Sequence, residues 1–151
     1  MFRPIPLLLA VLALAGCGGD DDDSDSGGGS SADPAETILA DSGLQVCSED
    51  QEQIAQSTVG TDFEAVRSFA VAKDCAGSET SPNTIRVFQF SSRESVDAGA
   101  VALEKAYPRG VVLTSGALVI VSTGPDGEAN ADAVGKAYED STGEPVQTVS
   151  V

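Results

Sequence analysis

The 151-residue chain contains no histidine, so it lacks both the commonest general base and the commonest zinc ligand. A serine activated by lysine is another nucleophile, but no S-x-x-K occurs, and the serines lie at predicted caps, turns and linkers. No G-x-x-x-x-G-K-[ST] loop is present to hold a phosphate group. We therefore predict no catalytic residue and no cofactor, because an enzyme would have to work with carboxylates alone.

Acidic and amide side chains alternate at Asp126, Glu128, Asn130 and Asp132, as oxygen ligands do in a calcium loop. Such a loop requires glycine at its sixth position for the turn, and Ala131 occupies that position here. We interpret these residues as the start of a helix, where the helix dipole favours carboxylates. The sequence predicts no metal site.

Two tyrosines, Tyr107 and Tyr138, occupy equivalent places in two predicted helices. They are either a pair of rings that stack on a ligand or two residues that close helix ends onto a sheet. We favour the second interpretation, because aromatic side chains make up only 5% of the chain and the core needs them. Since tryptophan is absent, a sugar-binding platform has little to be built from.

The elements that position these residues follow from caps, breakers and hydrophobic spacing. Ser91 and Glu94 form a capping box for one long helix, which Pro108 ends. Glu49–Ser57 is too polar for a core element and is predicted to be a helical turn or loop. The predicted helices cover residues 33–43, 91–107 and 128–140, and the predicted strands cover residues 44–48, 63–73, 84–90, 110–115, 117–122 and 146–151.

A shift of 31 residues aligns Val87–Ser92 with Leu118–Thr123 and Ala102–Tyr107 with Ala133–Tyr138. Strand then lies on strand and helix on helix, which suggests two strand-strand-helix repeats. The alternative is a chance similarity between two alanine-rich helices.

If the repeat is genuine, both helices cover the same face of one sheet. We therefore predict the α+β class, with a small antiparallel sheet and two main helices on one face, as a two-layer sandwich. The opposite face would then be open, with side chains such as Gln89 or Arg86 available for docking.

The N-terminal residues 1–16 have the order of a secretory signal peptide, with Arg3 followed by an apolar run from Ile5 to Ala15. This run is shorter than the roughly 20 residues that a membrane-spanning helix needs. The sequence LAGC, Leu14–Cys17, resembles the lipobox of bacterial lipoproteins. The resemblance implies cleavage before Cys17 and a lipid on its sulfur, which anchors the protein at the extracytoplasmic face of the cell membrane. The alternative is an ordinary secretory signal whose cysteine falls near the cleavage point.

Residues 17–33 are predicted to be the lipidated cysteine and an acidic linker. Gly18–Asp33 contains six aspartates, five glycines and four serines, and it has nothing to bury. Such a composition predicts a disordered tether that spans roughly 20 to 24 Å. Its negative charge is repelled by an anionic leaflet, so the tether holds the folded part away from the membrane.

Cys47 and Cys75 are the two cysteines that remain once Cys17 carries the lipid. In a compartment outside the reducing cytosol, we predict that they form a structural disulfide. The alternatives are two unpaired thiols or a redox pair, although the spacing is unlike C-x-x-C.

Residues 34–151 are predicted to form a single globular domain. Eighteen acidic residues against seven basic ones leave this domain a net charge of −11, which would repel nucleic acid. With an anchor, a tether and no catalytic groups, we expect a non-catalytic interaction or adaptor module that docks to an envelope protein. A lipoprotein that binds a small ligand or a cation is the alternative, and an envelope enzyme using carboxylates is less favoured.

Overall fold

The computed structural model describes residues 34–50, 54, 56–77 and 81–149. The predicted signal peptide, Cys17 and the acidic linker therefore lie outside the described residues. Helices and strands follow one another along the described part of the chain in this order: α1 (Pro34–Asp41), β1 (Gln45–Asp50), α2 (Gln56–Val59), β2 (Ala65–Ala72), β3 (Thr84–Gln89), α3 (Arg93–Ala106), β4 (Val111–Ser115), β5 (Leu118–Thr123), α4 (Gly127–Thr142) and β6 (Gln147–Val149).

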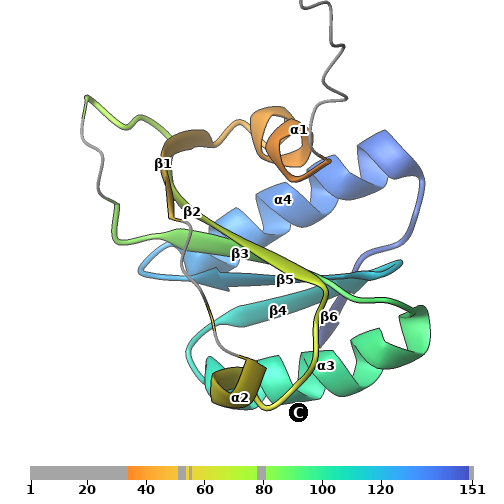
Figure 1. The fold of residues 1–151 in the computed structure, drawn as a ribbon. Coiled ribbons are helices and arrows are strands. Elements are labelled where there is room, and N and C mark those ends of the chain that lie inside the picture. The colour runs from red at the N-terminus through yellow and green to blue at the C-terminus, as the bar shows by residue number, and fades with distance from the viewer. Residues whose placement is uncertain (1–33, 51–53, 55, 78–80, 150–151) are drawn as a thin grey trace, which may run out of the picture. The chain divides into compact units, whose positions relative to one another are not determined.

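All six of these strands form one sheet in the order β1-β2-β3-β5-β4-β6 (Figure 1). Every neighbouring pair is antiparallel. The prediction of an α+β domain built on an antiparallel sheet is confirmed. The predicted elements recur with shifted ends. The segment Glu49–Ser57, predicted to be a helical turn or loop, begins with the end of β1 and ends with the start of the short helix α2.

Helices cover both faces of this sheet, with α1 and α4 on one side and α2 and α3 on the other (Figure 1). Because side chains alternate along a strand, each central strand supplies both cores. On β5, Ile120 belongs to the α1/α4 core, while Val119 and Val121 belong to the α2/α3 core. The part of the chain from residue 34 to residue 149 that the structure describes thus has three layers around two hydrophobic cores.

The expectation that both main helices share one face is therefore wrong. The physical reason for the observed arrangement is the direction of the two helical connections that cross from one strand to a parallel one. β3 and β4 are parallel to each other with β5 between them, and β5 and β6 are parallel with β4 between them. Helix α3 makes the first crossover and α4 the second, and both move the same way across the sheet. Since β3 and β5 run in opposite directions, two crossovers of the same hand must pass over opposite faces.

Because α3 and α4 lie on opposite faces, the two predicted strand-strand-helix repeats are not related by a symmetry axis in the structure. A two-fold axis that exchanges the antiparallel strands β3 and β5 stands perpendicular to the sheet, so it would leave both helices on one face. Helices α3 and α4 instead contribute to different cores. The two strand-strand-helix units are therefore not related by such an axis, and Ala102–Tyr107 and Ala133–Tyr138 lie on opposite faces of the sheet.

Helix ends follow local signals with small shifts. The N-cap of α3 is Ser92 rather than Ser91, and its hydroxyl accepts a hydrogen bond from the backbone N–H of Ser95. Helix α4 ends at Gly143, whose positive φ of 72° suits a residue without a Cβ. Within the part of the chain that the structure describes, none of the helices combines the length and apolar character needed to cross a bilayer.

Candidate binding site

Three neighbouring strands expose a part of the sheet that α1 and α4 leave uncovered. The strand register places Ala65 of β2 opposite Gln89 of β3, and Gln89 opposite Leu118 of β5. One row further along, Arg67 stands opposite Val87. Cross-strand partners, and residues two apart on a strand, point to the same face, so these side chains gather on the α1/α4 side.

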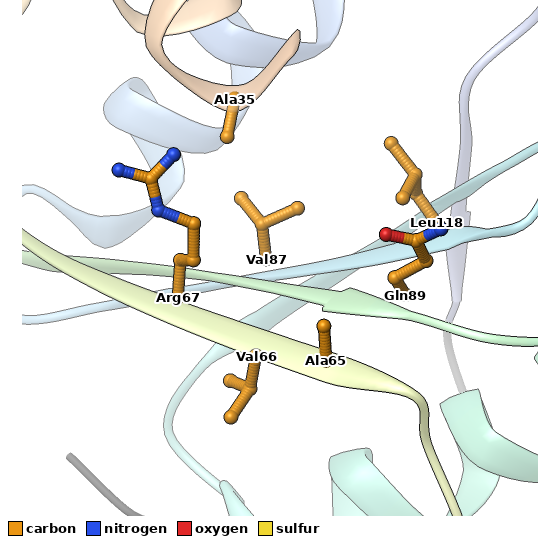
Figure 2. A pocket seen from close by; sticks show the side chains of 7 residues that line it. All are labelled: Ala35, Ala65, Val66, Arg67, Val87, Gln89 and Leu118. Carbon is orange, nitrogen blue, oxygen red and sulfur yellow. The ribbon is translucent and has the colours of Figure 1, made fainter. Parts of the chain in front are cut away.

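These side chains surround a pocket of about 240 Å³ (Figure 2). We call it the sheet pocket, and it is lined by Ala35, Ala65, Val66, Arg67, Val87, Gln89 and Leu118. Figure 2 shows that the Ala35 side chain, in the first turn of α1, points toward the strands of the sheet. The Val66 side chain points to the opposite face of the sheet. The aliphatic side chains of Val87 and Leu118 are half-buried, so the site presents apolar surface to solvent.

Arg67 forms one wall of the sheet pocket, and three neighbours hold its guanidinium in place. Its Nη2 donates to Oε1 of Glu36 on α1 at 3.0 Å, and its Nε donates to Oε1 of Glu49 on β1 at 2.8 Å. The guanidinium also lies over the Phe69 ring, 4.9 Å from the centroid. Two carboxylates therefore surround one cation, so this wall carries a net negative charge.

The arrangement is suited to binding. A pocket of about 240 Å³ is smaller than the roughly 300–1,000 Å³ of a typical site for a drug-sized ligand. Both carboxylates at its wall accept hydrogen bonds from Arg67, so neither stands as an isolated acid or base. Among the residues that the structure describes, no three His, Cys, Asp or Glu side chains gather in a way that could hold a metal ion.

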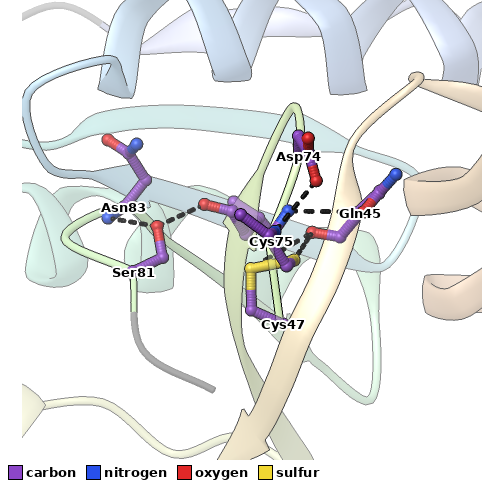
Figure 3. The surroundings of a disulfide bond; sticks show 8 residues. Gln45, Cys47, Asp74, Cys75, Ser81 and Asn83 are labelled. Carbon is purple, nitrogen blue, oxygen red and sulfur yellow. Dashed lines mark hydrogen bonds between the residues drawn. A yellow bond between two sulfur atoms is a disulfide. The ribbon is translucent and has the colours of Figure 1, made fainter. Parts of the chain in front are cut away.

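Cys47 and Cys75 are joined in a disulfide, as the cysteine count predicts, with their Cα atoms 5.3 Å apart. The bond ties the edge strand β1 to the segment that follows β2 (Figure 3). Beside it, the backbone N–H of Cys75 donates to the Gln45 side-chain oxygen at 3.3 Å. The disulfide lies at a bulge of β1, between Val46 and Ser48, and is a structural clamp on the strand that carries Glu49.

Gln89 and Arg86, which the sequence analysis placed together on an open face, lie on opposite faces. They are an odd number of residues apart on β3, so their side chains diverge. Gln89 lines the sheet pocket, whereas Arg86 lies over the Tyr107 ring, 5.1 Å from its centroid, and donates to the Thr123 hydroxyl. The expectation of an open face is wrong, since helices cover both faces, and the sheet pocket is an accessible part of the α1/α4 side.

The other residues singled out from the sequence have structural surroundings. Tyr107 packs against the α2/α3 core and Tyr138 lies in the α1/α4 core, so the two rings cannot stack on one ligand. Asp126 precedes α4, and its carboxylate accepts a hydrogen bond from the buried amide of Asn83 at 3.0 Å. Asn130 is buried within α4 rather than facing a shared ion.

Sequence reasoning missed Ala35, Ala65, Arg67 and Leu118 as site residues. Small and aliphatic side chains carry no chemical signal, and Arg67 read as an ordinary strand residue. The strands were predicted, but their pairing order was not, and only the order β2-β3-β5 brings these side chains into adjacent rows.

The chain was also compared with known proteins, and no protein family, curated protein or solved structure matches it.

Proposed function

We propose that the protein is a lipid-anchored, non-catalytic adaptor at the extracytoplasmic face of the cell membrane. It binds a protein partner by receiving one apolar side chain of that partner in the sheet pocket. The single observation that carries this proposal is the sheet pocket itself, an accessible and mostly apolar hollow on the α1/α4 face of the sheet. The anchor rests on the lipobox-like sequence that ends at Cys17.

The size of the sheet pocket favours a side chain over a separate small molecule. Its volume is below the usual range for ligand sites, and the guanidinium at its wall is already paired with two carboxylates. Few polar groups are therefore left to orient a small molecule. Protein interfaces commonly concentrate their binding energy in one apolar or aromatic side chain that fills such a hollow.

Site-specific photo-crosslinking in the native membrane tests the docking site. A photoreactive residue replaces Gln89 at the pocket, and a matched probe replaces Ala98, an exposed residue of α3 on the opposite face. We expect a discrete protein adduct from position 89 only, and we expect Ala65→Leu, which fills the pocket, to abolish it. An adduct that survives Ala65→Leu contradicts the proposal. A small molecule that is retained in native mass spectra and lost in Ala65→Leu would instead support the ligand-binding alternative.

The anchor has its own experiment. Cys17→Ser removes the sulfur that would carry the lipid, so the variant should lose acyl mass and leave the membrane fraction. A variant that stays in the membrane fraction would show that the lipoprotein interpretation is wrong.

A further inference from the structure

The charge around the sheet pocket limits which partner segment can occupy it. Glu36 and Glu49 both pair with Arg67 at the wall, and 58% and 35% of their side chains are exposed. The domain around this wall has a net charge of −11, from eighteen acidic and seven basic residues. An acidic segment would therefore meet repulsion, and it would have to draw Arg67 away from two existing partners.

The volume of the sheet pocket adds a second constraint. A hollow of about 240 Å³ has room for one side chain, so the residues that flank it in the partner must cross the rim. Glu36 follows the lining residue Ala35 in the first turn of α1 and pairs with Arg67, which also lines the pocket. Cationic flanking residues would pair with these carboxylates without displacing Arg67.

We propose that the segment that fills the sheet pocket carries an aliphatic side chain flanked by lysine or arginine, a deduction that rests on the proposed function. Sixteen residues separate Cys17 from Pro34, the first residue of α1. A chain of that length spans at most roughly 55 Å. An anchored domain therefore meets such a basic segment near the bilayer, on a membrane protein or on a protein held at the membrane.

Peptide titrations test this directly, using the chain from residue 17 onward with Cys17→Ser so that no lipid competes for the pocket. The probes are three capped peptides with the cores Lys-Leu-Lys, Lys-Ala-Lys and Glu-Leu-Glu between Gly-Ser ends. Binding is followed by NMR shifts of the backbone amides. We expect Lys-Leu-Lys to shift Ala65, Val87 and Leu118, and to bind at least about tenfold more tightly than Lys-Ala-Lys, because its leucine side chain is buried.

The charge requirement is tested by a matched pair of variants. Glu36→Gln removes a first-turn glutamate beside the sheet pocket, and Glu94→Gln removes a first-turn glutamate of α3 on the opposite face. Glu36→Gln should weaken Lys-Leu-Lys binding about two- to fivefold, the range of an exposed ion pair. Glu94→Gln should leave it unchanged. The wild-type preference should also shrink as salt is added.

Three results would overturn the inference: Glu-Leu-Glu binding as tightly as Lys-Leu-Lys, equal effects of the two glutamine variants, or no binding by any peptide. None of them would overturn the proposed function if the crosslink from position 89 still disappears in Ala65→Leu. Persistence of that crosslink in Ala65→Leu would remove the proposed function, whatever the peptides do.

Discussion

The two faces of the sheet differ in how closely their helices approach it. On the α2/α3 face, Gly99 lets α3 lie against the Phe90 ring, and a methyl group at that position would overlap the ring. Phe88 is fully buried beside it and meets Phe63 edge to face, with the ring centroids 5.2 Å apart. This face is closed by aromatic packing.

The α1/α4 face is covered less completely. Helix α1 has only eight residues, and α4 packs over β4 and β5, so the ends of β2 and β3 remain accessible at the sheet pocket. Contacts between residues far apart in the chain hold the strands around the sheet pocket, namely the ion pairs of Arg67 and the disulfide of β1. The comparison teaches that both faces carry a buried core, while the α1/α4 face also leaves room for a binding site.

The largest expected effect separates two neighbours on β3. Phe88→Ala empties the closed face and should lower the free energy of unfolding by about 3–5 kcal/mol. Val87→Ala removes two methyl groups from a half-buried pocket residue and should cost less than about 1.5 kcal/mol. Urea denaturation measures both values. Equal losses would contradict the difference in burial between Phe88 in the α2/α3 core and Val87 at the sheet pocket.

The disulfide ranks next in effect. Replacing Cys47 and Cys75 together by alanine opens a loop with a sequence separation of 28 and should cost about 3 to 4 kcal/mol, from the loop entropy returned to the unfolded chain. Because β1 carries Glu49, the same variant should also weaken Lys-Leu-Lys binding. Unfolding curves and peptide titrations test the two effects separately. Unchanged binding would show that β1 holds Arg67 without the clamp.

Two helical glycines provide a matched test of the helix-to-sheet distance. Gly99→Ala in α3 forces the Phe90 ring to move, a cost of about 1–3 kcal/mol that the better helix propensity of alanine only partly offsets. A methyl group at Gly135 in α4 would meet Leu113 at 3.4 Å, an ordinary contact. Gly135→Ala should therefore stabilise the domain by up to about 1 kcal/mol. Thermal unfolding compares the variants, and destabilisation by both would contradict the difference between the faces.

The smallest expected effect concerns pH. Burial, together with the nearby Glu144 carboxylate, raises the pKa of Tyr138 above its ordinary value of 10.0. The folded state then holds this proton more tightly than the unfolded state, so the linked stability is present below pH 10.0 and is lost as the pH rises above it. Tyr138→Phe should flatten this alkaline decline in the unfolding midpoint. A decline of the same slope in the variant would assign it to other groups.

Much of the secondary structure could be predicted from local sequence signals. Ser91, Ser92 and Glu94 mark the start of α3 to within one residue, and Gly43 and Gly143 end α1 and α4 at positive φ. One stretch of the sequence also indicated that helices cover both faces of the sheet. Leu118–Val121 is apolar without interruption, which is typical of a strand buried on both faces rather than on one.

The candidate site could not be predicted in the same way. Ala65, Gln89 and Leu118 come from three strands, and their meeting depends on the strand order and register. Arg67 is held at the pocket by Glu36 and Glu49, which lie 31 and 18 residues away in the chain. No local pattern encodes such pairings.

By itself, the sequence determined the types of the elements and the acidic character of the domain, because these follow from local backbone preferences and composition. It predicted the pairing of Cys47 with Cys75 on the premise that Cys17 carries a lipid, and the structure contains that disulfide. Only the tertiary structure decided that α3 and α4 cover opposite faces and that a pocket remains beside α1. Both results depend on strand order and crossover hand, which place residues far apart in the chain side by side.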